Sequence, residues 1–452
     1  MPGALAPGDL GHRRVLALAV PIMLSNVSTP LIGVVDTAVV GRLPGAEHVG
    51  AVALGSLIFS LVFWAFGFLR MATTGLTSQA DGAGDGLEVR AALLRAGVFA
   101  AAIGLPMMAL GPLVRSVSLW AVPGSIEVEG LAADYIDVRI FAAPATFANY
   151  ALTGWFIGLG RSKTALILQL VLNLTNMALD AVLVLHFDLG VAGVAWGTVA
   201  AETVAACVGV AIAWRAFSRL PEAAGDLRAR VFDRERLGRA VSVSGDIMVR
   251  SLALVVVFVF VSARGAAESD VVLAANAVLM HFIDTSAYFL DGLAYAAETL
   301  VGRAVGAGDA TRLRLAVRRT TLWAAVFAGV ATLLLLAFGP TFIDALTLDP
   351  ATRTTARTYR FWAVFAPLLG VLCFQLDGIF IGATEGRTMR NAMLTSTAIF
   401  FAAFFLLRPF SNHGLWAAFY VHYLARTLTL GSAYPGLVRR TAALKPRSRA
   451  AS

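Results

Sequence analysis

The chain has 452 residues, of which 58% are hydrophobic and only 14% are charged, whereas about 25% of the residues in an ordinary soluble domain are charged. The composition therefore excludes a soluble globular protein. The formal net charge of +8 does not indicate nucleic-acid binding, because most basic residues lie in short segments between apolar stretches, where they set membrane orientation. Cys207 and Cys373 both fall inside apolar stretches, so we expect neither a structural disulfide nor a metal site.

Apolar segments of roughly 20–27 residues follow one another along the chain, each long enough to cross a bilayer. The first begins after His12-Arg13-Arg14, is too long for a signal-peptide core and lacks a clear cleavage site, so we interpret it as a retained span. The predicted spans are 15–41, 49–77, 91–114, 131–157, 164–186, 190–214, 238–263, 271–300, 320–338, 358–382, 391–408 and 413–435.

Most Lys and Arg residues lie in the N-terminal segment, in every second loop and in the C-terminal tail. Because basic residues are enriched on the cytoplasmic side of a membrane, both termini are predicted to be cytoplasmic, with the protein in the plasma or inner membrane. The layout predicts an N-terminal lobe (1–214), a cytoplasmic connector (215–237), a C-terminal lobe (238–435) and a basic tail (436–452). We expect a monomer.

Several motifs occur twice along the chain, always at one constant offset. Gly82-Ala83-Gly84-Asp85 and Gly154-Trp155-Phe156-Ile157-Gly158 recur as Gly306-Ala307-Gly308-Asp309 and Gly378-Ile379-Phe380-Ile381-Gly382, while Arg90 and Arg95 recur as Arg314 and Arg319. Composition alone does not explain matched charged and glycine positions, so the chain is interpreted as a duplication. Two halves of six spans enter the membrane from the same side, which makes them parallel repeats. The predicted fold is an all-α polytopic membrane protein of twelve transmembrane helices in two six-helix lobes.

The first half carries polar groups inside its predicted spans. Asp36 lies in the first span, about three turns after Asn26, and Asn173, Asn176 and Asp180 share one helical face of the fifth span because they are three and four residues apart. Ionisable groups within spans usually face a cavity or a partner. We favour function over simple interhelical hydrogen bonding for the two carboxylates.

The duplication supplies an internal control for this interpretation. At the same offset, Asp36 corresponds to Phe260 and Asp180 to Phe404. If the carboxylates only held a lobe together, the second lobe would need them too. The acidic pair is therefore predicted to be a coupling site particular to the first half, where entry of a proton or Na⁺ competes with a cationic substrate. Two carboxyls that face each other titrate as a pair.

The second half is expected to have its own buried polar groups: Asp246, Arg250, Asp284, Asp291, Glu298 and Asp377. Asp246 and Arg250 are four residues apart, so they are expected to neutralise each other on one helix. For the remaining acids a structural network and a second ion or substrate site are both open. Arg70, Arg139 and Glu202 are expected to pair helices or to lie at the membrane interface.

Four motifs resemble the multidrug and toxic compound extrusion (MATE) family, and more closely its DinF-like branch. They are Asp36-Thr37-Ala38-Val39-Val40-Gly41-Arg42, Phe68-Leu69-Arg70-Met71-Ala72-Thr73-Thr74-Gly75, Asp291-Gly292-Leu293-Ala294-Tyr295-Ala296-Ala297-Glu298 running into Leu300-Val301-Gly302, and Asp377-Gly378-Ile379-Phe380-Ile381-Gly382. The resemblance implies two six-helix lobes around a V-shaped cavity, and export of organic cations or drugs in exchange for H⁺ or Na⁺.

The resemblance also implies particular residues. The family's cation site, for a proton or Na⁺, resembles Asp36, Asn176, Asp180 and Thr198, and Pro21 resembles a proline proposed to bend the first span. Some members instead use acids of the seventh and tenth spans; Asp377 matches the latter, but Asp246 is only the nearest acid to the former, which favours the first half. The candidates for the substrate cavity are Asn26, Tyr135, Asn149, Asn173, Asp291 and Asp377.

Two alternatives are weighed against an antiporter. A flippase for lipid-linked precursors would require a strongly cationic central cavity, whereas the groups in mid-span are mostly acidic. An integral membrane transferase would require clustered His, an Asp-rich metal motif or a nucleophile with its base, and only His281 and Asp284 lie close together. The prediction is a secondary active antiporter for amphipathic, cationic or zwitterionic compounds, with a small organic substrate and the bilayer as partners, and without an enzymatic activity, cofactor or nucleic acid.

Overall fold

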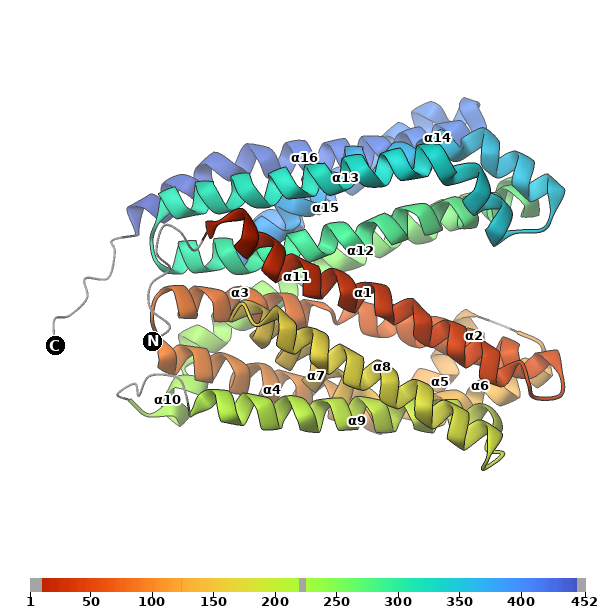
Figure 1. Cartoon of the computed structure of the whole chain (residues 1–452), viewed down its shortest axis with the longest axis horizontal. Helices are drawn as coiled ribbons and strands as arrows, with labels where there is room; N and C mark the ends of the chain where they lie inside the picture. The colour runs from red at the N-terminus through yellow and green to blue at the C-terminus, as the bar shows by residue number, and fades with distance from the viewer. Residues whose placement is uncertain (1–9, 123, 219–224, 445–452) are drawn as a thin grey trace. The chain divides into compact units, whose positions relative to one another are not determined.

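A computed structural model describes residues 10–122, 124–218 and 225–444, and within them the regular structure is entirely helical (Figure 1). Lys445, Arg447 and Arg449 of the predicted basic tail lie outside the described residues. The helices of the first half are α1 (His12–Val40), α2 (Ala46–Ala65), α3 (Phe68–Gly82), α4 (Gly86–Ala109), α5 (Gly111–Ala121), α6 (Ile126–Arg139), η2 (Ile140–Ala142), α7 (Ala143–Gly158), α8 (Ser162–Leu185) and α9 (Gly190–Phe217). Those that follow are α10 (Leu227–Val231), α11 (Arg234–Glu268), α12 (Asp270–Gly306), α13 (Ala310–Leu346), α14 (Pro350–Gly382), α15 (Gly386–Leu407), η3 (Arg408–Phe410) and α16 (Ser411–Ala443).

Each predicted span coincides with helical structure, but three spans of the first half are broken. The second span consists of α2 and α3, the third of α4 and α5, and the fourth of α6, η2 and α7. The fourth breaks where Pro144 enters the first turn of α7, because proline fits a helix start but removes a hydrogen bond from a helix interior. Within the described residues, 10 helical stretches are long and apolar enough to cross a membrane; α15 and α16 count as one stretch, and the broken fourth span is not among them.

Helices of the second half are longer than their apolar cores suggested. The ninth span was predicted at 320–338, whereas α13 extends from Ala310 to Leu346. The added first turns contain Arg312, Arg314, Arg318 and Arg319, which an apolar window does not recognise. A hydropathy pattern locates the part of a helix that suits lipid, but a helix continues beyond it as long as its backbone hydrogen bonds are made.

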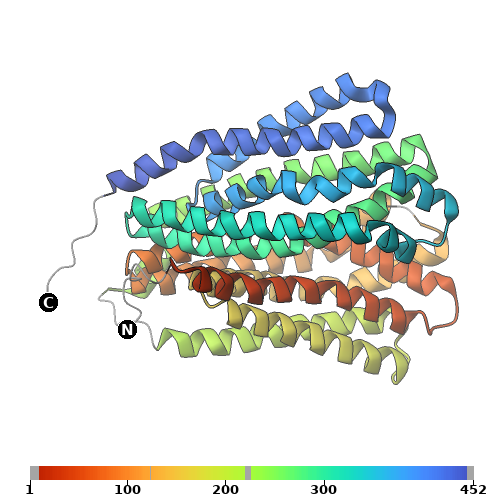
Figure 2. The same cartoon turned by 45° about the horizontal axis from the view of Figure 1, so that its top comes forward.

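The described chain forms two compact units. One contains residues 24–77 and 85–240, and the other contains residues 10–23, 78–84 and 241–444. In the first unit α8 packs along α9, α4 along α7, and α2 along α6. In the second, α12 packs along α14 and α15 along α16, around a core rich in large side chains such as Trp416, Phe419 and Tyr423. Figure 2 shows the same helices from a second direction.

The repeated Gly-Ala-Gly-Asp motif ends one helix and starts the next in both halves. Gly84 and Gly308 have φ values of 71° and 67°, in the left-handed region that glycine adopts without steric cost. The aspartate that follows caps the next helix: Asp85 accepts a hydrogen bond from the backbone N–H of Glu88 at 3.0 Å, and Asp309 from that of Arg312 at 2.9 Å. The motif therefore connects two consecutive helices in the same way in both halves.

The repeated glycine pair in α7 and α14 marks a close helix approach. In the first unit, a Cβ atom on Gly154 would collide with the carbonyl oxygen of Arg70, and one on Gly158 would lie 2.8 Å from that of Thr74. In the second unit, Gly378 and Gly382 meet the carbonyl oxygens of Ala294 and Glu298 in the same way. These partners are related by the same offset as the glycines themselves, so the duplication extends to the backbone contacts.

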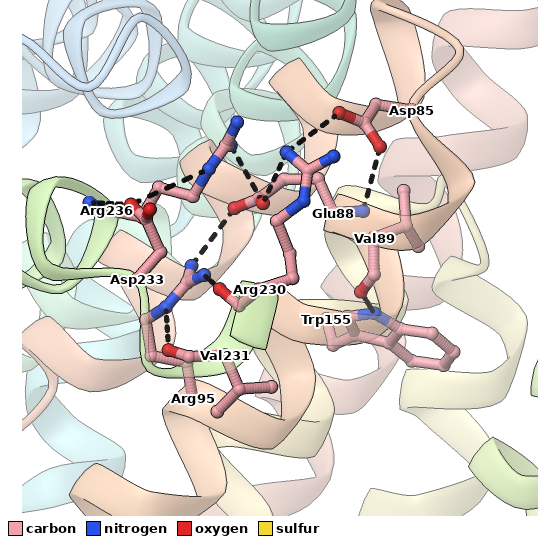
Figure 3. Close-up of polar contacts among 9 residues, drawn as sticks. All are labelled: Asp85, Glu88, Val89, Arg95, Trp155, Arg230, Val231, Asp233 and Arg236. Carbon is pink, nitrogen blue, oxygen red and sulfur yellow. Dashed lines mark hydrogen bonds and ion pairs between the residues drawn. The ribbon is translucent and has the colours of Figure 1, made fainter. Parts of the chain in front are cut away.

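One of the repeated arginines, Arg95, holds a short segment against a helix (Figure 3). The side chain of Arg95 on α4 is only 2% exposed and donates to the carbonyl oxygens of Arg230 (2.9 Å) and Val231 (3.2 Å) in α10. Glu88 binds Arg95 at 3.0 Å and Arg236 at 2.8 Å. The segment that precedes α11 is thereby attached to the first unit.

The second repeated arginine makes the equivalent contact. Arg319 on α13 donates a hydrogen bond to the carbonyl oxygen of Leu10, just before α1. Arg95 of the first half thus binds the segment before α11, and Arg319 of the second half binds the segment before α1. Sequence alone matched Arg95 with Arg319 but gave no indication of what either binds.

Candidate ion-coupling site

The polar stripe of α8 is its buried face. Asn173, Asn176 and Asp180 are all almost completely buried, whereas Leu170, Leu174 and Val182 on the other side of the helix are exposed. A helix that buries its amides and carboxylate and exposes leucines has the polarity expected in lipid. The three residues thus lie on one face of α8, as their spacings of three and four residues predicted.

Asp180 lies at the centre of a polar cluster drawn from three helices of one unit. The carboxyl group of Asp36 on α1 lies next to it, close enough for the two side chains to interact. The amide Nδ2 of Asn176 donates to Asp180 Oδ1 at 3.3 Å and to Thr198 Oγ1 of α9 at 3.2 Å. The structure therefore brings together the four residues that the family resemblance implied for cation binding, although α1, α8 and α9 are far apart in sequence.

The chemistry of this cluster is that of oxygen acceptors. An ionised carboxylate can only accept hydrogen bonds, so Asp36 and Asp180 can hydrogen-bond to each other only when one of them carries a proton. Asp36 Oδ1, Asp180 Oδ2 and Asn176 Oδ1 are buried and have no hydrogen-bond partner among the described residues. Buried polar atoms normally have a partner, and hard oxygen donors suit a proton or a hard cation such as Na⁺. No group of three or more His, Cys, Asp or Glu side chains in the described ranges is arranged to hold a metal ion.

Gly197 makes room for the Asp180 carboxylate, and sequence reasoning missed it. A Cβ atom at Gly197 would overlap Asp180 Oδ1. Gly197 directly precedes Thr198 in a helix rich in small residues, and this position could have indicated its role from the sequence. Glycine at this point lets α9 approach α8 with its backbone beside the acid.

Asn149 belongs to a neighbouring network in the same unit. Its Nδ2 donates to the backbone oxygen of Glu202 at 2.9 Å and to the Glu202 carboxylate at 2.7 Å. Arg139 lies 3.8 Å from the same carboxylate and stacks over the rings of Phe59 and Phe63. The prediction that Arg139 and Glu202 pair helices is confirmed.

The other predicted cavity residues of the first half also have partners. The Tyr135 hydroxyl lies 3.3 Å from Ser56 Oγ, and its ring packs against Gly55. Asn173 donates to Ser28 Oγ of α1 at 2.8 Å. Asn26 is half-buried. Tyr135, Asn149 and Asn173 are thus each held by a hydrogen bond between helices.

In the second half, the predicted pairing of Asp246 with Arg250 is wrong. Asp246 binds Arg390 of α15 at 2.6 Å, while Arg250 binds Asp377 of α14. Arg426 of α16, which sequence reasoning overlooked, binds Asp377 as well. The two groups are one turn apart on α11, but each is directed to a partner on a different neighbouring helix. The signal for Arg426 was a lone arginine within an apolar span.

The remaining acids of the second half differ in burial. Asp284 and His281 are exposed rather than buried, so the expectation of a buried Asp284 is wrong. Asp291 is half-buried and Glu298 is buried. Asp377, a candidate for the substrate cavity, is buried between two guanidinium groups.

Comparison with known proteins finds relatives that cover most of the chain. A family model described as MatE matches residues 21–182 and 247–407. The chain is 36% identical to the DNA damage-inducible protein F of Escherichia coli (strain K12) over 419 residues, covering 92% of this chain and 90% of that protein. It is 28% identical to a probable multidrug resistance protein NorM of Rhizobium meliloti (strain 1021) over 455 residues, covering 95% and 94%.

Solved structures share the fold. An outward-facing multidrug resistance MATE transporter of the MOP superfamily superposes with a TM-score of 0.82 at 18% identity, covering 95% of this chain and 96% of that one. A MOP superfamily transporter from Pyrococcus furiosus gives a TM-score of 0.84 at 17% identity, covering 98% and 100%. These likenesses confirm the all-α membrane fold predicted from the sequence.

Proposed function

Because the chain belongs to the MatE family of multi-pass membrane transporters, which are not enzymes, we propose that it is a secondary active antiporter coupled at Asp36 and Asp180. It exports amphipathic, cationic organic compounds in exchange for H⁺ or Na⁺ by alternating access. The observation that carries this proposal is the pair of adjacent carboxyl groups on α1 and α8, with Asn176 and Thr198 beside it.

The charge of the carboxyl pair determines how strongly it attracts a cationic substrate. With one shared proton the pair bears a single negative charge, and loss of that proton adds a second. A buried site with two negative charges attracts an organic cation strongly, and entry of H⁺ or Na⁺ removes that attraction. Competition of this kind couples the two fluxes without any covalent step. The unpartnered oxygens of Asp36, Asn176 and Asp180 are the acceptors that either ion requires.

Substrate and location follow from the relatives and from charge. Relatives described as probable multidrug resistance proteins support a broad class of organic compounds as cargo. The likeness to a bacterial protein and the basic residues of the N-terminal segment, alternate loops and C-terminal tail support a place in the inner membrane with both termini cytoplasmic.

Transport in proteoliposomes tests the proposal. Uptake of a fluorescent organic cation is measured under a pH gradient alone and under a Na⁺ gradient alone, for the unaltered protein, for Asp36→Asn and for Asp137→Asn. Asp137 is a partly exposed carboxylate of the same half that pairs with Arg115, so it is a matched control. We expect one gradient to drive uptake, Asp36→Asn to abolish it and Asp137→Asn to retain it. Undiminished exchange in Asp36→Asn would overturn the assignment.

A further inference from the structure

Two buried arginines of the second unit share one carboxylate. Arg250 of α11 and Arg426 of α16 each donate an Nη2 hydrogen to the same oxygen, Oδ2 of Asp377 on α14. The three residues are 6%, 3% and 6% exposed, respectively. The cluster thus joins three helices and is closed off from bulk water.

The charges of this cluster do not balance. Two guanidinium groups face one carboxylate, and in the part of the chain that the structure describes neither arginine lies within 4.0 Å of any other carboxylate. Arginine remains protonated in proteins. A buried charge without a counter-charge is strongly unfavourable, so the cluster favours one further negative charge.

The hydrogen bonds do not balance either. Each guanidinium has five N–H donors, and the Nε atoms of both Arg250 and Arg426 are buried without a partner. Cys373 and His422 lie close enough to interact electrostatically with both arginines, and both are fully buried. The site therefore has buried donors to spare, and a hydrogen bond from a charged donor to an anion is strong in a buried site.

The duplication shows that this excess of positive charge is particular to the second half. At the offset of the repeated motifs, Arg250, Asp377 and Arg426 correspond to Asn26, Thr153 and Glu202. The three positions thus carry a net charge of −1 in the first half and +1 in the second half. Packing of the shared fold does not require these arginines.

We propose that Arg250 and Arg426 form a buried binding site for a monovalent anion, with Asp377 as an internal counter-charge. The ligand is either a free halide or the carboxylate of an organic molecule, since both accept hydrogen bonds from paired guanidinium groups. The site is separate from the acidic pair of the first half, and its occupancy is measured without transport. The anion site could therefore exist even if the antiport proposal failed, and antiport could occur even if the anion site did not exist.

Thermal unfolding of the purified full-length protein in detergent tests this site. Chloride, acetate or benzoate is titrated against methanesulfonate at constant ionic strength and pH. Binding to the folded state alone raises the unfolding temperature saturably with ligand concentration. Saturable stabilisation by chloride identifies a free ion, whereas stabilisation by acetate or benzoate but not by chloride identifies a carboxylate.

Charge variants give effects of opposite sign. Arg426→Gln and Arg250→Gln each remove the excess charge, and we expect them to weaken anion binding at least about tenfold. Asp377→Asn adds excess charge and should strengthen it. Arg390→Gln, which removes an arginine paired elsewhere in the same unit, should leave it unchanged. If no anion stabilises the unaltered protein saturably, or if both Arg250→Gln and Arg426→Gln retain the effect, the proposal is wrong. The arginine variants decide the matter even where Asp377→Asn does not fold.

Discussion

The two halves of this transporter place contrasting chemistry at equivalent positions. Asp36, Asn176, Asp180 and Thr198 correspond, at the offset of the repeat, to Phe260, Phe400, Phe404 and His422. The second set is also a contact cluster: ring centroids of Phe260 lie 4.9 Å from Phe404 and 5.8 Å from Phe400, and Phe400 lies 6.0 Å from His422. One scaffold therefore holds a polar cluster in one half and an aromatic cluster in the other.

This difference separates structure from function. Aromatic pairs stabilise helix contacts without any buried charge, so the acids are not needed to hold these helices together. Buried acids are costly in a membrane, and the presence of the Asp36–Asp180 pair in only one half supports the proposal that this pair has a function. The same comparison applies to Glu202 and Arg426, which are equivalent in position and opposite in charge.

The largest expected effect comes from the acidic pair itself. Asp36→Asn and Asp180→Asn should each reduce coupled export to background, and the double variant should be no worse, because the two carboxyls act as one titrating unit. Both amides can still hydrogen-bond, so the unfolding temperature should change little. Transport and thermal unfolding of the three variants check this. Independent, multiplying losses of activity would show that the residues do not act as a pair.

Gly197 offers a finer test of the same cluster. Gly197→Ala places a methyl group on Asp180 Oδ1 and should lower coupled transport roughly tenfold to a hundredfold by displacing the carboxylate. The equivalent residue of the second half is Val421, where aromatic neighbours replace the acid. Gly97→Ala is the control, because a Cβ atom there meets no other atom within 4 Å. Equal activity of both variants would mean that Gly197 does not position Asp180.

The shared scaffold should respond alike in both halves. Gly154→Ala and Gly378→Ala each force a Cβ atom against a backbone carbonyl oxygen, and overpacking of this kind costs about 1–3 kcal/mol of unfolding free energy. Thermal unfolding measures both, with Gly97→Ala and Gly329→Ala as matched controls that meet no neighbour. If only one of the two substitutions lowered the unfolding temperature, the equivalent glycines would not be packed equally tightly.

The smallest expected effect is local. Arg95→Gln leaves the carbonyl groups of Arg230 and Val231 without their donor, and hydrogen exchange in α10 should accelerate about tenfold or more. Arg319→Gln should instead accelerate exchange at the start of α1 and leave α10 unaffected. Exchange followed by mass spectrometry separates the two segments. Faster exchange of α10 in Arg319→Gln would contradict the assignment of one segment to each arginine.

Local patterns in the sequence were sufficient for much of the fold. The apolar lengths and the repeated glycine and aspartate motifs are local features, so a linear pattern reveals them, whereas the structure showed that Asp85 and Asp309 cap helices. The breaks near Gly67 and Pro144 were less visible, because an apolar window does not register a change of helix direction. The buried face of α8 followed from spacing alone, whereas the site residue Gly197 depends on the approach of a second helix.

The sequence by itself determined that this protein is a duplicated, all-helical membrane transporter whose Asp36 and Asp180 have no acidic counterpart in the second half, because hydropathy, helical period and internal repetition are properties of the chain. Only the tertiary structure decided which charges meet. Asp246 pairs with Arg390 rather than with Arg250 one turn away, and Asp377 lies between Arg250 and Arg426. Partners far apart in the chain are chosen by how helices pack and rotate against one another, which no local spacing encodes.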